Sequence, residues 1–193
     1  WTALATSLIT FALSLWMLAR FDASSGNMQM EFLMPWFTLG GNPISVHFGV
    51  DGISILMVLL TTILTPIAIL STWNAVTDKV KGFMSFFLAL ETGMLGVFLS
   101  LDMVLFYVFW EFTLIPMYFL IGLWGGERRV YAAVKFFLYT FAGSILMLAA
   151  ILWMGLQYGS FDISQLTGAG LIPAVAQLWL FGAFGLAFAI KVP

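Results

Sequence analysis

The chain has 193 residues, of which 62% are hydrophobic and only 8% charged, with a formal net charge of -2. So few polar side chains cannot cover a water-soluble domain of this length, which excludes a soluble globule and indicates an integral membrane protein. The small net charge gives no reason to expect a nucleic-acid partner. Cysteine is absent and histidine occurs once, so we expect these residues to bind no iron–sulfur cluster, bis-imidazole haem or other metal.

Apolar runs predict an all-α, multi-pass bundle in a single transmembrane domain, because each run is about as long as a spanning helix. The link from 20 to 52 contains Pro35, Pro43 and neighbouring glycines, which argue against another span and favour a short hairpin or an interfacial segment. The chain starts at Trp1 and ends just after Lys191 in an apolar run, so we interpret it as part of a longer polypeptide. The predicted helices cover approximately residues 1–18, 53–73, 83–101, 103–124, 130–156 and 173–193.

Basic residues predict the orientation of the bundle in the membrane. Lys79, Lys81, Arg128 and Arg129 lie in links that share one side, whereas the opposite links hold only Arg20. Because lysine and arginine are enriched in cytoplasmic loops, we expect the start of the chain and these two links to face the cytoplasm of a bacterial inner membrane.

An acidic side chain stands in the middle of the fourth apolar segment. Glu111 lies about nine residues from either flank, near the centre of a hydrocarbon layer of about 30 Å. An ionisable group at that depth costs about 2.5–3.5 kcal/mol on insertion scales, which favours a role in proton or ion transfer over one in packing. Pro116 cannot donate to the carbonyl of Phe112 and should bend this helix one turn later; the bend either binds water or is only a packing kink.

A lysine stands near the end of the sixth apolar segment. Lys191 is followed two residues later by Pro193, which weakens the helical backbone where the ammonium emerges. A charge at a broken helix is typical of ion sites near the midplane of membrane transporters. The alternative is a lysine that extends to the interface from the end of an ordinary span. Position alone does not separate the two.

Two further ionisable residues lie inside predicted helices. Lys135, about five residues into the fifth segment, either reaches the cytoplasmic edge or points inward as a proton uptake station. Glu91, in the third segment, comes to a depth similar to that of Glu111 if the two helices form a hairpin, and is the weaker acidic candidate. Asp51 and Asp102 stand at helix starts, where an N-cap role suffices.

A buried glutamate and a buried lysine together suggest a mechanism. Apolar surroundings favour the neutral amine, and an approaching carboxylate favours the ammonium. Opening and closing a Glu–Lys contact can therefore load and discharge the lysine. Each charge moved works against the membrane potential at about 2.3 kcal/mol per 100 mV, so an external energy source is required.

Three runs carry a family resemblance: HFGVDGISILMVLLTTILTPIAIL, then the motifs WE-x3-IPMYFLI-x-LWGG and AA-x-KFFLYT, and finally FAIKVP. They resemble the antiporter-like, proton-translocating chain M of respiratory complex I, the NADH–quinone oxidoreductase, over nearly the whole chain. The resemblance implies about fourteen transmembrane helices in two inverted repeats, each with a broken helix. The present residues correspond to the second to seventh helices, without the first helix and the second repeat.

The resemblance also implies functional residues and partners. Glu111 matches the family's pathway glutamate, Lys191 its central lysine on the broken helix, and Lys135 a lysine of the pathway, while Glu91 is no family hallmark. The complex is expected to use NADH, flavin, iron–sulfur clusters and quinone in other subunits, with none bound here. The sister chains L and N, in the same lipid bilayer, are the expected partners. The redox reaction elsewhere is expected to drive proton transfer through this chain.

Rival functions share the buried charges. A membrane subunit of a multisubunit cation/proton antiporter or of a membrane-bound hydrogenase has the same ancestral fold, and a purely structural scaffold would use buried charges to lock helices together. The residues do not decide between a proton and a sodium ion as the transported species.

Overall fold

The computed structural model describes residues 1–167 and 172–192. Within these two ranges, six helical spans are long and apolar enough to cross a membrane, which confirms the predicted number. The sixth predicted segment ended at Pro193, which lies outside the described residues. The spans are α1 (Thr2–Arg20), α2 (Ser54–Ser71), α3 (Val80–Leu99), the pair α4 (Met103–Phe112) and α5 (Leu114–Trp124), α6 (Arg129–Tyr158) and α8 (Ala174–Lys191).

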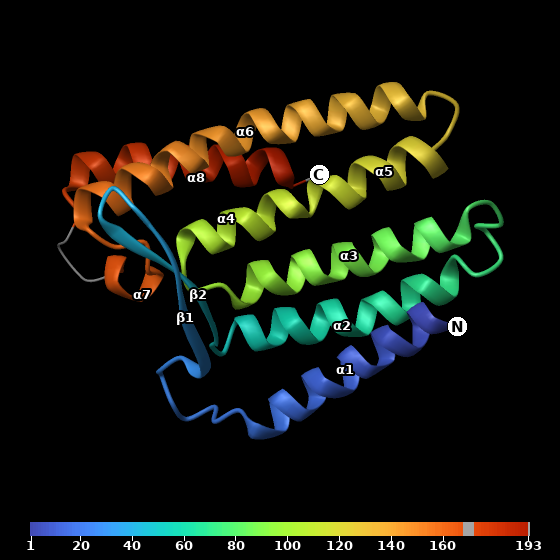
Figure 1. Cartoon of the computed structure of the whole chain (residues 1–193), viewed down its shortest axis with the longest axis horizontal. Helices are drawn as coiled ribbons and strands as arrows, with labels where there is room; N and C mark the ends of the chain where they lie inside the picture. The colour runs from blue at the N-terminus through green and yellow to red at the C-terminus, as the bar shows by residue number, and fades with distance from the viewer. Residues whose placement is uncertain (168–171, 193) are drawn as a thin grey trace.

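The helices pack in the order of the sequence. Figure 1 shows α1, α2, α3 and the α4–α5 pair side by side, followed by α6, with α8 lying along α6. The first helix starts at one end of the bundle, called here the Trp1 end, where the α2–α3 and α5–α6 links also lie (Figure 1). Short links explain this order, because they force consecutive helices to be antiparallel neighbours.

A β-hairpin covers the opposite end, called here the hairpin end (Figure 1). Strands β1 (Gln29–Leu39) and β2 (Asn42–Val50) pair antiparallel, and the turn between them uses Gly40 and Gly41 at φ values of 59° and 87°. Glycine is suited to these positive φ values because it has no Cβ. Of the two structures considered for this link, the hairpin is the one that forms. The short helix α7 (Ile163–Leu166) lies at the same end.

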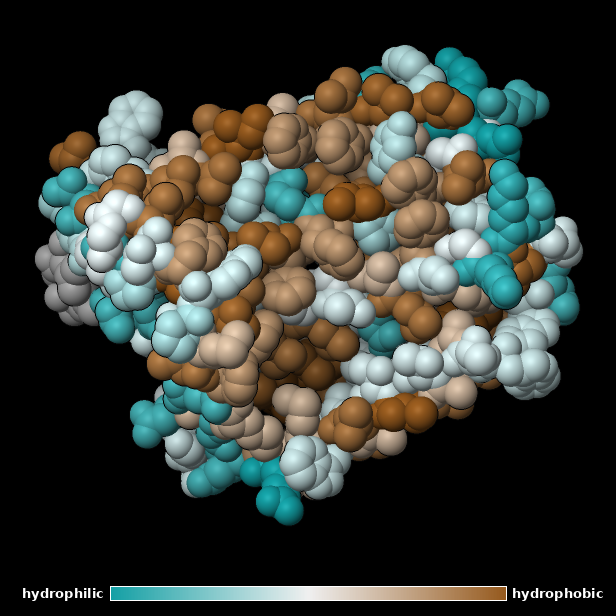
Figure 2. Space-filling model, viewed as in Figure 1, coloured by the Kyte–Doolittle hydropathy of each residue, from teal (hydrophilic) through white to brown (hydrophobic). Residues whose placement is uncertain are grey.

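The hairpin end is anchored by an apolar cluster that joins β2, α6 and α8. Phe161 is completely buried, and its ring occupies the space left by the missing side chain of Gly155. The cluster consists of Ile44, Met147, Ile151, Phe161 and Ala187. Elsewhere large apolar side chains face outward, and Figure 2 shows them across the middle of the molecule with most hydrophilic residues toward its ends. This distribution suits a protein whose middle is surrounded by lipid.

Candidate functional site

The α4–α5 span is interrupted beside the buried glutamate. Glu111 is the last residue but one of α4, and the helix resumes at Leu114 after a break at Thr113. Pro116 lacks the amide hydrogen that would bond to the carbonyl of Phe112, which accounts for a break at this point. The predicted bend one turn after Glu111 is therefore an interruption slightly closer to the acid. The break turns polar backbone and the Thr113 hydroxyl toward α8.

Lys191 reaches this break from the last turn of α8. Its Nζ donates to the hydroxyl of Thr113 at 3.0 Å and to the carbonyl oxygen of Trp110 at 3.3 Å. The same ammonium lies 4.4 Å from the centre of the Trp110 ring, an arrangement that stabilises a cation. The ring of Phe188, on α8, meets Trp110 edge to face at 5.3 Å and holds it in place. Lys191 therefore points into the bundle, and its side chain does not extend to the interface.

The Glu111 carboxyl lies beside this lysine without forming an ion pair. The polar groups around it are the hydroxyls of Tyr107 and Ser144 and the ammonium of Lys191. Its Oε1 is buried and has no hydrogen-bond partner among the described residues. Within the described residues, the ion pairs closer than 4.0 Å all involve His47. The acid and the lysine are thus neighbours in an open arrangement, each with capacity for a further partner.

A groove of about 580 Å³ leads to the Lys191 ammonium. Its wall is largely apolar, with Leu90 and Met94 from α3 and Ile190 from α8, while Thr140 and Tyr139 of α6 supply hydroxyls. A low-polarity wall strengthens any charge interaction inside the groove.

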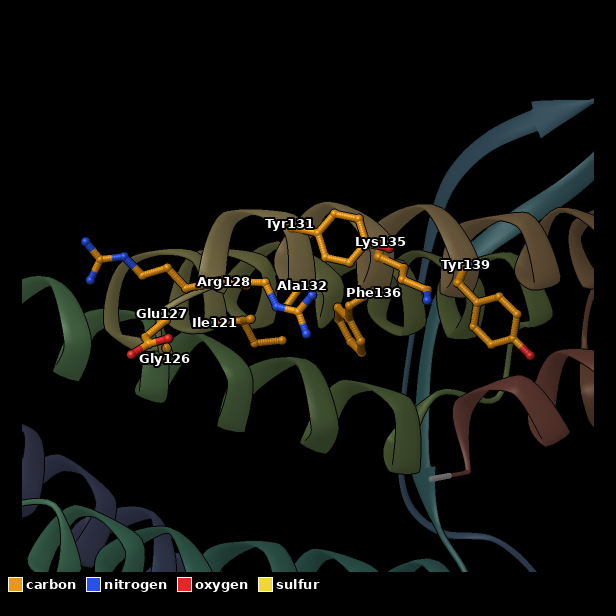
Figure 3. Close-up of a pocket in the computed structure, with 11 residues that line it drawn as sticks. Ile121, Gly126, Glu127, Arg128, Tyr131, Ala132, Lys135, Phe136 and Tyr139 are labelled. Atoms are coloured by element: carbon orange, nitrogen blue, oxygen red, sulfur yellow. The ribbon is translucent and has the colours of Figure 1, made fainter.

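Lys135 lies on the outer side of α6, in a second groove of about 600 Å³ (Figure 3). Its side chain is exposed and lies between Tyr131 and Tyr139, with Nζ 5.8 Å from the centre of the Tyr131 ring. Phe136 and Tyr139 line both this groove and the one that leads to Lys191. The structure therefore does not bring Lys135 into contact with the Glu111–Lys191 pair, but places it in an adjoining groove.

Glu91 faces a different neighbour. Its side chain is only 3% exposed and lies against Thr65 of α2. Gly93, about 200° further round α3 at 100° per residue, packs against Thr113. The two acids come to a similar depth, as expected from the α3–α4 turn, but they lie on different sides of α3 and do not face each other.

Sequence reasoning missed a polar cluster at the hairpin end. His47 of β2 is buried, with Nδ1 2.6 Å from a carboxylate oxygen of Asp162 and Nε2 3.1 Å from one of Glu31. Asp102 caps α4 as expected and also accepts the backbone amide of Ser45. The cluster joins the hairpin to two interhelical links, and only long-range pairing reveals it. No three histidine, aspartate or glutamate side chains in residues 1–167 and 172–192 are arranged to hold a metal ion.

The two aspartates of this cluster have opposite electrostatic surroundings. Burial raises the pKa of the Asp102 carboxyl above its ordinary value, despite the amides that it accepts. Burial acts in the same direction on Asp162, but hydrogen bonds from Ser164 and His47 outweigh it and hold the pKa of Asp162 below its ordinary value. Asp162 therefore stays a carboxylate beside the imidazole.

The fold and the site define a class of membrane protein, and comparisons with known families agree. Residues 100–193 match the family described as NADH:quinone oxidoreductase/Mrp antiporter, transmembrane. A subunit of respiratory complex I from Thermus thermophilus with bound NADH superposes with a TM-score of 0.83 at 31% identity, over 99% of this chain and 39% of that one. The chain therefore has an antiporter-like transmembrane fold, as the complex I subunit does.

Individual relatives point to one subunit. The chain is similar to NADH-quinone oxidoreductase subunit M of Rhodobacter capsulatus, at 45% identity over all of this chain and 39% of that protein. It is also similar to subunit M of Rickettsia prowazekii, at 40% identity and the same coverage. These similarities confirm the resemblance seen in the sequence motifs. The chain spans about two fifths of the length of these relatives.

A more distant structure shares the fold. The Mrp complex from Dietzia superposes with a TM-score of 0.85 over 98% of this chain and 20% of that one, at 18% identity. This likeness concerns the fold alone.

Proposed function

We propose that the chain is part of a proton-translocating membrane subunit of a respiratory NADH:quinone oxidoreductase, and that protons pass through Glu111 and Lys191. The observation that carries the proposal is the position of Lys191, whose ammonium is bound at the α4–α5 break by Trp110 and Thr113, the residues that flank Glu111. The acid itself keeps an oxygen without a partner.

The geometry supports two states of one lysine. In the observed state the ammonium bonds to a neutral hydroxyl and a carbonyl; in the other it moves a short way along the break and contacts the Glu111 carboxylate. Contact between the charges favours the ammonium, and separation in an apolar groove favours release of its proton, because an uncompensated buried charge is costly. Alternation between the states loads and discharges Lys191.

We propose that the energy for this alternation comes from outside this chain. Moving one charge against the membrane potential costs about 2.3 kcal/mol per 100 mV. We assign the source to NADH-dependent quinone reduction in other subunits, which would hold the flavin, the iron–sulfur clusters and the quinone. The other membrane subunits, including sister chains L and N, would be lateral partners. Lys135, in the groove beside that of Lys191 and near the basic Trp1 end, would be the uptake station on the cytoplasmic side.

Replacing Glu111 by glutamine tests the proposal in the full-length subunit within its assembled complex. The amide keeps the size and hydrogen-bonding capacity of the acid but cannot carry the charge that attracts Lys191. We expect NADH-driven acidification of inside-out vesicles to be mostly lost while the subunit still assembles. Glu127→Gln, in the exposed α5–α6 link, is the matched control and should leave acidification unchanged. Loss of assembly before loss of transport would support a scaffold instead.

A cation/proton antiporter is the rival that the fold permits, because the Mrp complex has a closely similar arrangement of helices. The two functions differ in what drives transport. An oxidoreductase subunit should acidify vesicles only while NADH is oxidised, whereas an antiporter should respond to an imposed sodium gradient without NADH. A sodium-driven response that survives inhibition of NADH oxidation would contradict our assignment.

A further inference from the structure

Glu91 is the most buried glutamate in the described residues, and nothing in the mechanism above uses it. Its side chain is 3% exposed, and its Oε1 has no hydrogen-bond partner among residues 1–167 and 172–192. Burying a carboxyl oxygen that has no hydrogen-bond partner is energetically costly. A residue that is kept at this cost requires a reason beyond packing.

Glu91 lies against the hydroxyl of Thr65 on α2, which is one of several buried hydroxyl residues on α1 and α2. We call the buried residues of this set the α1–α2 hydroxyl stripe. Within it, Ser14 and Thr62 share a hydrogen bond of 2.8 Å across the two helices, and the Thr65 hydroxyl donates to the Thr61 carbonyl at 2.9 Å. The stripe consists of Ser7, Ser14, Thr61, Thr62 and Thr65.

A proline adds a free acceptor to this stripe. Pro66 is buried inside α2 and cannot donate to the carbonyl of Thr62, one turn earlier. Hydroxyls and a released carbonyl beside an acid are the groups that ordered water binds in a protein interior. The α1–α2 hydroxyl stripe, which reaches Glu91 at Thr65, therefore offers binding sites for water.

A cleft approaches this acid from the Trp1 end. It has a volume of about 410 Å³, lies between α1, α2 and α3, and is lined by polar groups that include Thr6, Lys81 and Ser85. Its inner wall includes Ile69 and Leu88. Since Leu88 precedes Glu91 by less than one helical turn, the cleft ends about 5 Å along the axis from the acid at 1.5 Å per residue.

No basic side chain compensates Glu91 at close range. Within the described residues it forms no ion pair, and Lys81, the cation of the cleft, stands ten residues earlier on the same helix, about 15 Å away along the axis. A buried carboxylate without a cation is strongly disfavoured relative to the neutral acid. The environment of Glu91 thus favours a bound proton.

We propose that Glu91 is a second proton-binding carboxyl, separate from the Glu111–Lys191 pair, which exchanges its proton with water in the cleft between α1, α2 and α3. In the exchange a hydronium in the cleft gives up an O–H bond as one forms on Oε1, and the reverse step returns the proton to water. The Thr65 hydroxyl holds the acid in place. This assignment stands whether or not Glu111 moves protons.

Access from the cleft can be measured with single cysteines, because the 193 residues contain none. In the assembled complex, with cysteines elsewhere blocked, a small charged methanethiosulfonate is added from the side of the Trp1 end. The Ser85→Cys and Glu91→Cys variants should react at least about tenfold faster than Thr92→Cys, because the thiolate forms where water takes its proton. Thr92 is the matched control, at the same depth on the outside of α3. Equal rates for Glu91→Cys and Thr92→Cys would overturn the proposal.

Infrared spectroscopy tests protonation without a cysteine. The difference spectrum between the native complex and Glu91→Gln should contain one carbonyl band of a protonated carboxylic acid, and this band should shift in D2O. Thr65→Val should move the same band, since it removes the neighbouring hydroxyl. Glu111→Gln should leave it in place, which separates this inference from the proposed function. A Glu91→Gln variant with no missing acid band would refute the proposal.

Discussion

Replacing Thr113 by valine should shift Lys191 out of its observed position. Valine has nearly the shape of threonine, and the site is 7% exposed, so packing changes little. The change removes the hydroxyl that accepts from Nζ at 3.0 Å and leaves the Trp110 carbonyl at 3.3 Å as the remaining hydrogen-bond acceptor of the ammonium. A hydrogen bond to a charged group contributes about 1.5–3 kcal/mol.

The free energy of this hydrogen bond determines how often the Lys191 ammonium lies at Thr113. At about 1.4 kcal/mol per factor of ten, the state in which the ammonium lies at Thr113 should become about tenfold to hundredfold less populated relative to the state in contact with Glu111. If alternation between these states moves protons, favouring one of them slows the cycle. The ratio of protons moved to NADH oxidised should therefore fall.

The assay is simultaneous measurement of NADH oxidation and acidification in inside-out vesicles that contain the complete complex. Thr113→Ser, which keeps the hydroxyl, is the matched control and should pump close to the native rate. The reasoning is refuted if Thr113→Val pumps as well as Thr113→Ser at equal subunit content. In that case the hydroxyl is not part of the site that holds the lysine between transfer steps.

Two further predictions concern packing and the hairpin end. Gly96→Ala would place a Cβ 2.2 Å from a ring atom of Phe109, so it should destabilise the α3–α4 packing by about 1–3 kcal/mol. The melting temperature of the purified complex should fall accordingly. Gly182→Ala is the control and should leave it unchanged, because no atom lies within 4 Å of the added Cβ. Asp162→Asn should weaken the hairpin anchor at His47. The folded-state pKa of Asp162 lies below its ordinary value of 3.8, so its contribution to stability is present above pH 3.8 and is lost as the pH falls through the folded-state pKa. The variant should therefore be cleaved by protease in the hairpin faster than the native protein near neutral pH, with the difference vanishing in acid; an undiminished difference in acid would contradict the assignment.

Composition and periodicity were enough to predict the spans, because lipid imposes a strong constraint on length and polarity. The predicted starts and ends differ from the observed ones by at most three residues. The largest deviation is at α3, which begins at Val80 instead of residue 83. Hydropathy does not locate the start of α3 well, because Lys81 interrupts the apolar run inside the first turn of the helix. Turn formers in the long link allowed a hairpin, but its strand pairing became visible only in three dimensions.

The sequence did not show how each helix is rotated about its axis, and the contacts within the site depend on that rotation. Glu111 could be selected from its depth alone, since any ionisable group inside the layer is costly, whereas Lys191 was selected from the proline that follows it. Depth could not show that Lys191 lies on Trp110 and Thr113, or that Glu91 turns toward α2, because these contacts depend on which face each helix presents to its neighbour. The His47 cluster was missed for a related reason: His47 and Asp162 lie 115 residues apart in sequence.

The break at Thr113 shows how a local feature of the sequence affects a contact between distant helices. Proline at 116 disturbs the helix for a local reason, the missing amide hydrogen, but the consequence is tertiary, because the hydroxyl and carbonyl at the break bind an ammonium from a helix 78 residues later. The Trp110 carbonyl and the Thr113 hydroxyl give Lys191 a binding position apart from Glu111. A lysine with one partner would form a static ion pair. In our proposal, the second binding position at Trp110 and Thr113 is what allows one lysine to have two states.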